Sequence, residues 1–257
     1  MMKPYDFIVI SGLDGVGKGT IEKELVALET SRGKKVFNTV EFSVHHGRLP
    51  TMEEFAPYDV LLTAEPTRSG IGRVIREEII AKNGRNYSSE TQIQLYSLDR
   101  LVQLSSLVIP ALKSGKRIIQ SRCFAETLNY QLLEALKEGR DAQKIRERVL
   151  AHEGNVLELK YSPTLLIIPT INNVDELMRR IEARKADGKD DNCVFENPEF
   201  QRSLKPLFED SWLKNLFESS GSIVRYLDAG ISVEETRRQA REIYAEVFPT
   251  LLQKVVT

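Results

Sequence analysis

"FIVISGLDGVGKGT" (residues 7–20) joins a short apolar run to a glycine-rich loop, and this junction decides the fold. The apolar run is typical of a buried strand, and helical spacing follows the loop, so we expect strand, loop and helix in succession. Gly12, Gly17 and Lys18 have the spacing G-x-x-x-x-G-K of phosphate-binding loops. Glycines let backbone amides close around phosphate oxygens, and a helix N-terminus adds a positive field. The stretch therefore predicts a nucleotide site in which Lys18 neutralises phosphate charge.

The two residues after Lys18 depart from the general motif. The motif has a hydroxyl at the next position, but Gly19 stands there and Thr20 follows it. The resulting G-K-G-T resembles the loop of adenylate kinases, which favours a nucleotide kinase over a GTPase switch. Asp14 inside the loop would repel phosphate, so we expect it to point away and accept a hydrogen bond, for example from a sugar hydroxyl.

The composition argues against several classes of protein. Among 257 residues, 36 Lys and Arg face 37 Asp and Glu, so no basic surface for nucleic acid is indicated. The two cysteines, Cys123 and Cys193, match neither a disulfide framework nor a zinc motif. No run approaches the roughly 18 apolar residues of a membrane span, and the first residues predict a strand rather than a signal peptide. We expect a cytoplasmic protein with no nucleic-acid or membrane partner.

Short apolar runs alternate with longer helical segments along the chain, which is the βαβ pattern of a parallel sheet covered on both faces. We predict one α/β domain over residues 1–257, with a three-layer P-loop NTPase fold, a five-stranded parallel sheet, helices on both faces and a lid. The runs that predict strands are residues 5–11, 34–43, 60–66, 116–122, 163–170 and 222–228. Residues 44–58 indicate a loop or insertion, 141–160 a charged amphipathic helix, and 184–197 a polar flap.

Residues 88–113 predict a long helix on which Gln92, Tyr96 and Arg100 share one face, because they are spaced by four. An aromatic ring with a guanidinium one turn away could clamp a base, with Tyr96 stacking and Arg100 bonding the base edge. The spacing alone favours the plainer alternative, which is a tyrosine at the core boundary and an arginine in a surface ion pair.

The ordered motifs of the chain resemble those of the thymidylate kinase family. The motifs "FIVISGLDGVGKGT", "LLTAEPTRSGIGRVIREEI", "LYSLDRLVQLSSLVIPALKSGKRIIQSR", "ETLNYQ" and "YLDAGISVEETRRQAREIY" occur in the order and spacing of that family across nearly the whole chain. Each motif is moderately specific, and the ordered set is strong. The resemblance implies phosphoryl transfer from ATP, with Mg²⁺, to a deoxynucleoside monophosphate, with dTMP as the first choice. It also implies a homodimer.

The same resemblance assigns residues to the donor, the acceptor and the transfer step. The ATP site would comprise Gly12, Gly15, Val16, Gly17, Lys18, Gly19, Thr20 and Arg184, with Thr20 near the metal. The acceptor site would comprise Asp14, Glu65, Arg68, Tyr96, Arg100, Arg122, Tyr130 and Gln131. The catalytic residues would be Lys18, Arg122, Lys185 and Lys189.

Within this assignment, Asp14 holds the 3'-hydroxyl of the acceptor sugar, and Tyr130 crowds its 2' position and so favours deoxyribose. Tyr96 stacks on the base, and Arg122 handles the acceptor phosphate. The polar stretch at about 184–197 corresponds to the family's lid, which brings positive charge to the transferred phosphoryl group.

Three positions depart from the family pattern. Ser121 stands where the family has an aspartate, Ala64 where it has an arginine, and residues 191–192 are Asp-Asn where the lid has Asp-Arg. These changes alter the charge of a site that works mainly by positioning and electrostatics. They leave open a compensation by Glu65 or Glu126, a different nucleotide or a deoxynucleoside as acceptor, or a nucleotide-binding protein with little kinase activity.

Overall fold

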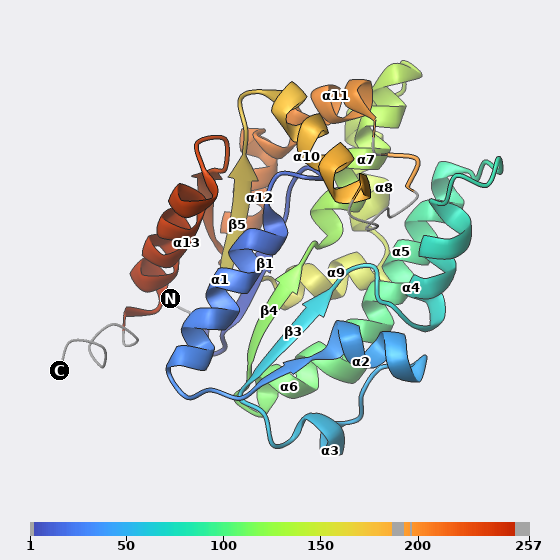
Figure 1. The fold of residues 1–257 in the computed structure, drawn as a ribbon. Helices are drawn as coiled ribbons and strands as arrows, with labels where there is room; N and C mark the ends of the chain where they lie inside the picture. The colour runs from blue at the N-terminus through green and yellow to red at the C-terminus, as the bar shows by residue number, and fades with distance from the viewer. Residues whose placement is uncertain (1–2, 187–192, 196, 250–257) are drawn as a thin grey trace.

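The computed structural model describes residues 3–186, 193–195 and 197–249, and it confirms the predicted fold class (Figure 1). Within these residues, six parallel strands form one sheet in the order β2-β3-β4-β1-β5-β6. The strands are β1 (Phe7–Ile10), β2 (Val36–Asn38), β3 (Val60–Ala64), β4 (Arg117–Ser121), β5 (Leu165–Thr170) and β6 (Ile223–Asp228). The central β1 pairs with β4 and β5, so the loops that leave the carboxyl ends of these strands meet at one edge of the sheet.

Helices cover both faces of this sheet (Figure 1). On one face α1 (Lys18–Ser31) packs against α13 (Val233–Val247), and on the other α5 (Ser89–Gln103) packs against α9 (Glu153–Lys160). The helical path of α5 continues through η2 (Leu104–Val108) and α6 (Ile109–Lys113), as predicted for this stretch. The other helical segments are α2 (Thr39–His46), α3 (Met52–Phe55), α4 (Gly70–Val74), η1 (Ile75–Ile79), α7 (Phe124–Lys137), α8 (Ala142–Leu150), α10 (Val174–Ala186), α11 (Pro198–Phe208) and α12 (Ser211–Ser219).

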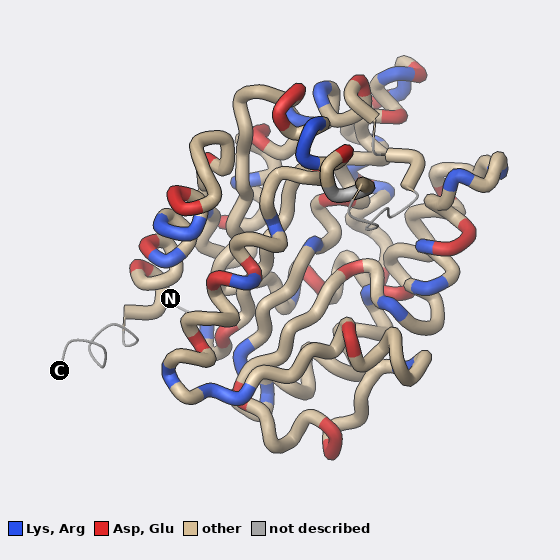
Figure 2. Tube along the Cα trace, viewed as in Figure 1, with Lys and Arg blue, Asp and Glu red and all other residues tan. Residues whose placement is uncertain are grey.

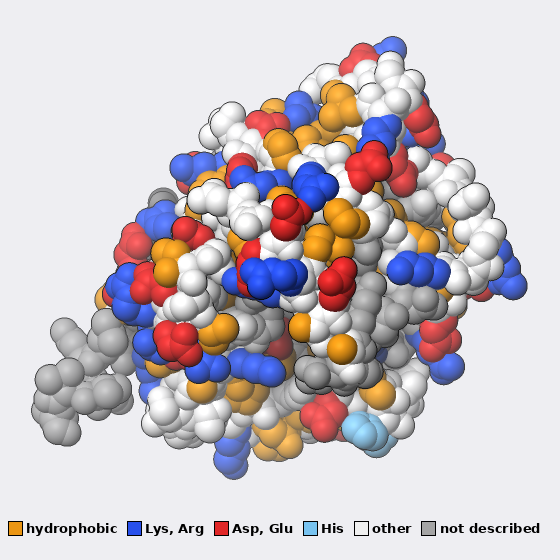
Figure 3. Space-filling view, turned by 45° about the horizontal axis from the view of Figure 1, so that its top comes forward, with side chains coloured by type: hydrophobic (Ala, Val, Ile, Leu, Met, Phe, Trp, Pro, Cys, Tyr) orange, Lys and Arg blue, Asp and Glu red, His pale blue; other side chains and the backbone are white. Residues whose placement is uncertain are grey.

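The burial of the strands follows from this layering. All four residues of β1 are fully buried, and five of the six residues of β5 are buried. A parallel sheet between two helical layers buries both sides of its central strands, so these strands carry continuous apolar runs. Charged residues lie mainly on the helices, where basic and acidic positions alternate (Figure 2), and the two signs are also mixed on the face drawn in Figure 3. Among the described helices, none has the length and apolar character to cross a membrane.

Two predictions about the sheet need correction. The sheet has six strands where five were expected. The short β2 pairs with β3 at one edge of the sheet, and β6 pairs with β5 at the other edge. The strand predicted over residues 34–43 ends at Asn38. The Asn38 side chain accepts hydrogen bonds from the Val40 and Glu41 amides, both at 3.1 Å, and so caps α2. This cap outweighs the strand propensity of the β-branched and aromatic residues that follow.

Two predictions about the connections also need correction. Residues 44–58 are not a loop throughout, since they contain the end of α2 and the short α3, which begins with a capping box of Thr51 and Glu54. Residues 141–160 form two helices, α8 and α9, because the chain turns at residues 151–152.

Helices α5 and α9 are in close contact at Gly154. A Cβ added to Gly154 would lie 1.9 Å from the backbone oxygen of Ser97, so only glycine fits there. The Gly154 amide also donates to Ser97 Oγ at 3.0 Å. This contact sets the distance between α9 and α5, and therefore how far side chains of α9 reach toward Arg100.

We expect Gly154→Ala to lower the free energy of unfolding by about 2–3 kcal/mol, because overpacking forces the backbones of α5 and α9 apart. Urea unfolding measures the change. Gly19→Ala is the matched control, since an added Cβ there meets nothing within 4 Å. Equal stability of the two variants would contradict the tight contact.

Candidate active site

The glycine-rich loop between β1 and α1 uses backbone conformations that glycine adopts without strain. Gly15 and Gly17 have φ angles of 76° and 112°. A Cβ on Gly15 would lie 2.7 Å from Ile181 Cγ1, so the loop packs tightly against α10. Gly17 is the N-cap of α1, so the unpaired amides of the first helical turn are available at the loop.

Lys18 is buried and its side chain turns back across the loop. Its Nζ donates to the carbonyl oxygens of Gly12 and Leu13, both at 2.7 Å. It also lies 3.8 Å from Asp14 Oδ1. The ammonium group therefore lies within the loop that would surround the phosphates.

The other loop residues of the predicted ATP site have distinct surroundings. Val16 is fully buried in the core. Gly19 has open space around it, so packing does not require glycine there. Thr20 is half-buried in the first turn of α1.

A cavity of about 420 Å³ lies beside the loop, within the size range of small-molecule sites. All eight residues of the predicted acceptor site line it: Asp14, Glu65, Arg68, Tyr96, Arg100, Arg122, Tyr130 and Gln131. The lining also includes Arg76, Glu126, Thr127, Cys193 and Phe195, which were not assigned there. The fold thus brings segments far apart in the chain to one cavity, while the role of each residue stays a prediction.

Asp14 connects the loop to this cavity. Arg122 donates to its Oδ1, and the Tyr130 hydroxyl donates to its Oδ2 at 3.2 Å. Burial alone would raise the pKa of Asp14, but the charges of Arg122 and Lys18 outweigh burial and hold this pKa below its usual range. The carboxylate is therefore ionised and engaged by residues of the cavity.

Arg122 follows β4 directly and has an unusual backbone. Its φ is 71°, and among the described residues no other non-glycine residue has a positive φ. This conformation costs about 1 kcal/mol or more for a residue with a Cβ. The Arg122 amide donates to Ile10 at 2.8 Å, and Gln120 Nε2 donates to the Arg122 carbonyl at 3.0 Å. These bonds hold the turn that directs the guanidinium toward Asp14.

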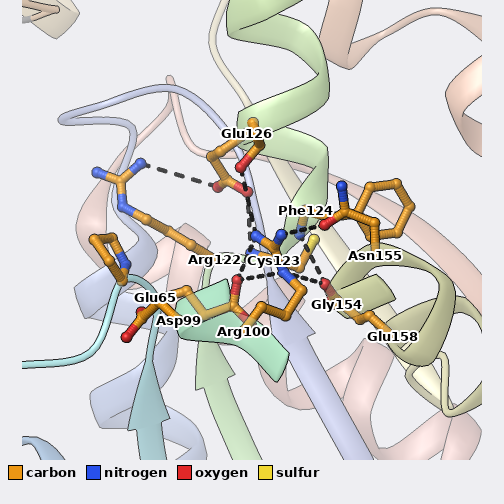
Figure 4. A network of polar contacts seen from close by, with 12 residues as sticks. Glu65, Asp99, Arg100, Arg122, Cys123, Phe124, Glu126, Gly154, Asn155 and Glu158 are labelled. Carbon is orange, nitrogen blue, oxygen red and sulfur yellow. Dashed lines mark hydrogen bonds and ion pairs between the residues drawn. The ribbon is translucent and has the colours of Figure 1, made fainter. Parts of the chain in front are cut away.

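Arg100 lies in a buried polar network at the wall of the cavity (Figure 4). Its Nη2 is 2.6 Å from Glu65 Oε2, and its Nε is 2.7 Å from Glu158 Oε2. Asn155 Oδ1 accepts a bond from its Nη1. Because Arg100 is only 1 % exposed, the surface ion pair that its spacing favoured is wrong, and the ion pair is a buried one. Its contact with a base edge stays a prediction.

Tyr96 and Gln92 share one face of α5, as their spacing predicted, and both line the cavity. Gln131 Nε2 donates to Gln92 Oε1 at 3.2 Å, which links α7 to α5 beside the predicted base site. Arg68 lines the same cavity from an exposed position after β3.

The two acids considered as compensation for Ser121 lie in different places. Glu126 accepts hydrogen bonds from Ser11 Oγ at 2.8 Å and from the Gly12 amide at 3.1 Å. Glu65 is instead held in the buried network around the arginine of α5. Glu126 is therefore the one of the two that touches the phosphate loop.

The predicted lid falls largely outside the described residues. Arg184 and Lys185 belong to α10, but their side chains lie outside the described part. Lys189 and residues 191–192 lie outside it altogether. The predicted roles of these residues stay predictions.

The far end of the same stretch reaches the cavity beside the loop. Cys193 and Phe195 line the cavity, and residue 193 forms a β-bridge with Ala81. The Phe195 ring lies 4.8 Å from the ring of Tyr130, measured between centroids. No periodicity in the sequence predicted this contact, since it joins segments more than sixty positions apart.

A second hollow, of about 550 Å³, lies between the turns that follow β5 and β6. Its lining includes Asn172, Arg180, Asp228 and Gly230. It adjoins the phosphate loop, because a Cβ on Gly17 would lie 3.8 Å from Ala229 Cβ. The "YLDAG" motif was the available signal for this site, although sequence reasoning assigned no role to it.

A strand leads into a glycine-rich loop that holds a buried lysine, and a helix begins at the loop. This arrangement defines a P-loop nucleotide-binding protein. The family model for thymidylate kinase matches residues 51–240, which is most of the chain. The chain belongs to the thymidylate kinase family.

Individual relatives agree with this family. A probable thymidylate kinase of Thermococcus gammatolerans is 28% identical over 238 residues, covering 90% of this chain and 92% of the relative. Another, of Pyrococcus horikoshii, is 33% identical over 138 residues, covering 52% of this chain and 55% of the relative. The solved thymidylate kinase of Candida albicans superposes with a TM-score of 0.63 at 21% identity, covering 96% of this chain and 93% of that chain. This structural likeness supports the fold.

Proposed function

We propose that this protein transfers the γ-phosphoryl group of MgATP to dTMP, giving ADP and dTDP. Membership of the thymidylate kinase family supports the reaction. The observation that carries the proposal is the cavity beside the phosphate loop, whose lining contains every residue of the predicted acceptor site. Asp14 and Arg122 lie where the loop and the cavity meet, so donor and acceptor would meet there too.

The donor phosphates would lie in the glycine-rich loop. Lys18, which bonds the carbonyls of Gly12 and Leu13, would exchange these partners for phosphate oxygens. The donor base would lie in the hollow between the turns after β5 and β6, because this hollow adjoins the loop at Ala229.

The acceptor would enter the 420 Å³ cavity with its phosphate near Arg122 and its base near Tyr96. A phosphate oxygen of the acceptor would then attack the γ-phosphorus in line, without a covalent intermediate. The protein would contribute positioning and charge stabilisation rather than a nucleophile. Closure of the stretch around 184–197 would exclude water, so that transfer outpaces hydrolysis.

Magnesium would be held mainly by the donor phosphates. Among the described residues, no group of three or more His, Cys, Asp or Glu side chains is placed to hold a metal ion. Mg²⁺ in such sites keeps several waters and uses few protein ligands, so Thr20 in the first turn of α1, or a water there, suits it. The ion would neutralise charge that develops on the donor.

A coupled assay of ADP release over a panel of nucleoside monophosphates tests this proposal. We expect dTMP to give the highest kcat/KM. Activity confined to another monophosphate, or higher with thymidine than with dTMP, would change the acceptor. Nucleotide binding without any turnover would indicate a binding protein instead of a kinase.

We expect Tyr96→Leu to raise the KM for dTMP about 30-fold and to leave the KM for ATP unchanged, since stacking on an aromatic ring contributes about 2 kcal/mol per base. Leucine keeps apolar volume but offers no aromatic face. Tyr96→Phe keeps the ring and serves as the control, with a KM for dTMP close to that of the wild type. If the two variants behaved alike in steady-state kinetics, the ring would not be the stacking partner.

The proposal extends to a cytoplasmic homodimer. Both cysteines are free thiols, which suits a reducing compartment. Leu98 and Val102 on α5 and Val156 on α9 are 45%, 41% and 51% exposed. A second copy packed on these helices would cover them. Sedimentation at micromolar concentration tests this assembly.

A further inference from the structure

One buried carboxylate joins the start of the phosphate loop to helix α7. Glu126 lies in the first turn of α7 and is only 6% exposed. Its Oε1 accepts a hydrogen bond from the Gly12 amide at 3.1 Å, and its Oε2 accepts from Ser11 Oγ at 2.8 Å and from the Cys123 amide at 3.1 Å. The bond from Cys123 belongs to the capping box that begins α7. The same side chain therefore holds both the loop and the helix.

The face of α7 that carries Glu126 is turned toward the loop. Tyr130 lies one turn further along this face, and its hydroxyl donates to Asp14 Oδ2 at 3.2 Å. Arg122, just before the helix, donates to Asp14 Oδ1, and its Nη1 lies 4.0 Å from Glu126 Oε1 (Figure 4). Tyr130 and Gln131 of the same helix line the cavity beside the loop. Helix α7 thus connects the loop to the predicted acceptor site.

This bridge requires a carboxylate rather than a side chain of the same length. Backbone N–H groups can only donate, and the amides of Gly12 and Cys123 bond different oxygens of Glu126. Glutamine has one accepting oxygen and one NH₂ group, so one of these two backbone amides would face another donor. The bridge would then fail at the loop or at the helix, whichever way the carboxamide turned.

The bridge gains importance when the donor binds. In the structure, Lys18 Nζ donates to the Gly12 carbonyl at 2.7 Å. Under the proposed function Lys18 exchanges this carbonyl for phosphate oxygens, so Gly12 loses a bond at the moment when the loop must hold its shape. The bond from the Gly12 amide to Glu126 involves no phosphate and can persist throughout the reaction.

We propose that Glu126 is a positioning residue, which fixes the phosphate loop relative to α7 and thereby the γ-phosphorus relative to the acceptor phosphate. This inference rests on the proposed function, because it requires in-line transfer between a donor in the loop and an acceptor in the cavity. A misplacement of about 1 Å between reacting groups can cost about 10²-fold in rate. Each nucleotide alone needs only its own part of the site, so the bridge affects transfer more than binding.

Glu126→Gln tests this role, with the transfer step measured by rapid-quench single turnovers at saturating ATP and dTMP. We expect the transfer rate to fall about 30-fold, while titration calorimetry shows that neither the Kd for ADP nor the Kd for dTMP rises more than about twofold. Glu134→Gln, the same substitution further along α7 at a residue that bonds Ser89, is the matched control and should keep the wild-type rate. Thermal unfolding checks that both variants are folded.

Ser11→Ala removes one of the two loop donors and keeps the carboxylate, so we expect a smaller loss of the transfer rate, about fivefold. Added to Glu126→Gln, it should cost less than this factor, because both changes break the same bridge. If Glu126→Gln did not fold, a wild-type transfer rate in Ser11→Ala would still overturn the inference.

Three other results would also decide against the inference. A wild-type transfer rate in Glu126→Gln, or weaker nucleotide binding with an unchanged rate, would overturn the positioning role. A rate restored by raising the Mg²⁺ concentration would make Glu126 a metal-binding residue instead. A wild type that binds nucleotides but transfers nothing to dTMP would overturn the proposed function together with this inference, which is a distinguishable result.

Discussion

Lys18→Met is expected to lower kcat for phosphoryl transfer by about 10³-fold, because one charged donor at the transferred group is worth about 4 kcal/mol in a preorganised site. Methionine keeps the length and apolar stem of the side chain but removes its charge. The ammonium lies within the glycine-rich loop, bonded to the carbonyls of Gly12 and Leu13. The coupled assay at saturating ATP and dTMP measures the loss.

Lys23→Met, an exposed position on the same helix, is the matched control and should keep nearly full activity. Lys18→Met also removes two buried hydrogen bonds, so we expect its free energy of unfolding to fall by about 1–2 kcal/mol. Urea unfolding separates this change from catalysis, since such a variant remains folded at 25 °C. A Lys18→Met protein with a tenth of the wild-type kcat would refute the assigned role.

Arg122→Ala is the second large change, and we expect kcat/KM for dTMP to fall by about 10²–10³-fold while the KM for ATP changes little. The guanidinium lies between the loop and the acceptor cavity, where it pairs with Asp14. Its removal takes away the charge that would align the acceptor phosphate. It also leaves the buried Asp14 carboxylate with Lys18 as its remaining cation, so the pKa of Asp14 should rise.

Arg122→Gly separates activity from backbone strain. Both small variants lack the guanidinium and should lose transfer equally. Glycine adopts the φ of 71° without strain, so we expect Arg122→Gly to be about 1 kcal/mol more stable than Arg122→Ala. Thermal or urea unfolding of the pair measures this difference. Equal stabilities would show that the turn is unstrained, and retained transfer in either variant would remove Arg122 from the mechanism.

The phosphate loop was predictable because it is local. Strand, loop and helix occupy residues 7–20 and the turns that follow, and glycine at positions 15 and 17 is required by backbone angles that neighbouring residues set. The periodicity of α5 likewise predicted that Tyr96 and Arg100 share one face of the helix, and both line the same cavity. The end of β2 was harder to predict, because Asn38 stops a stretch whose composition favours a strand.

The buried network was not predictable in the same way. Glu158 and Asn155 belong to a stretch that shows only a charged amphipathic pattern, and such a pattern normally describes a solvated helix. Both are fully buried, because α9 is packed on α5 through the contact at Gly154. The spacing of Arg100 on α5 favoured a surface ion pair. Spacing along one helix does not show which side chains a second helix, here α9, places against that residue.

By itself, the sequence determined the glycine-rich loop and the α/β fold, because these follow from local backbone geometry and periodicity. The set of residues that line the cavity came from the resemblance of the ordered motifs to the thymidylate kinase family. Only the tertiary structure decided that Arg100 is shared by two carboxylates and that Glu126 touches the loop. Arg100 is 35 positions from Glu65 and 55 from Asn155 along the chain. Contacts at such separations depend on how helices pack in three dimensions, and no spacing rule within one helix contains that information.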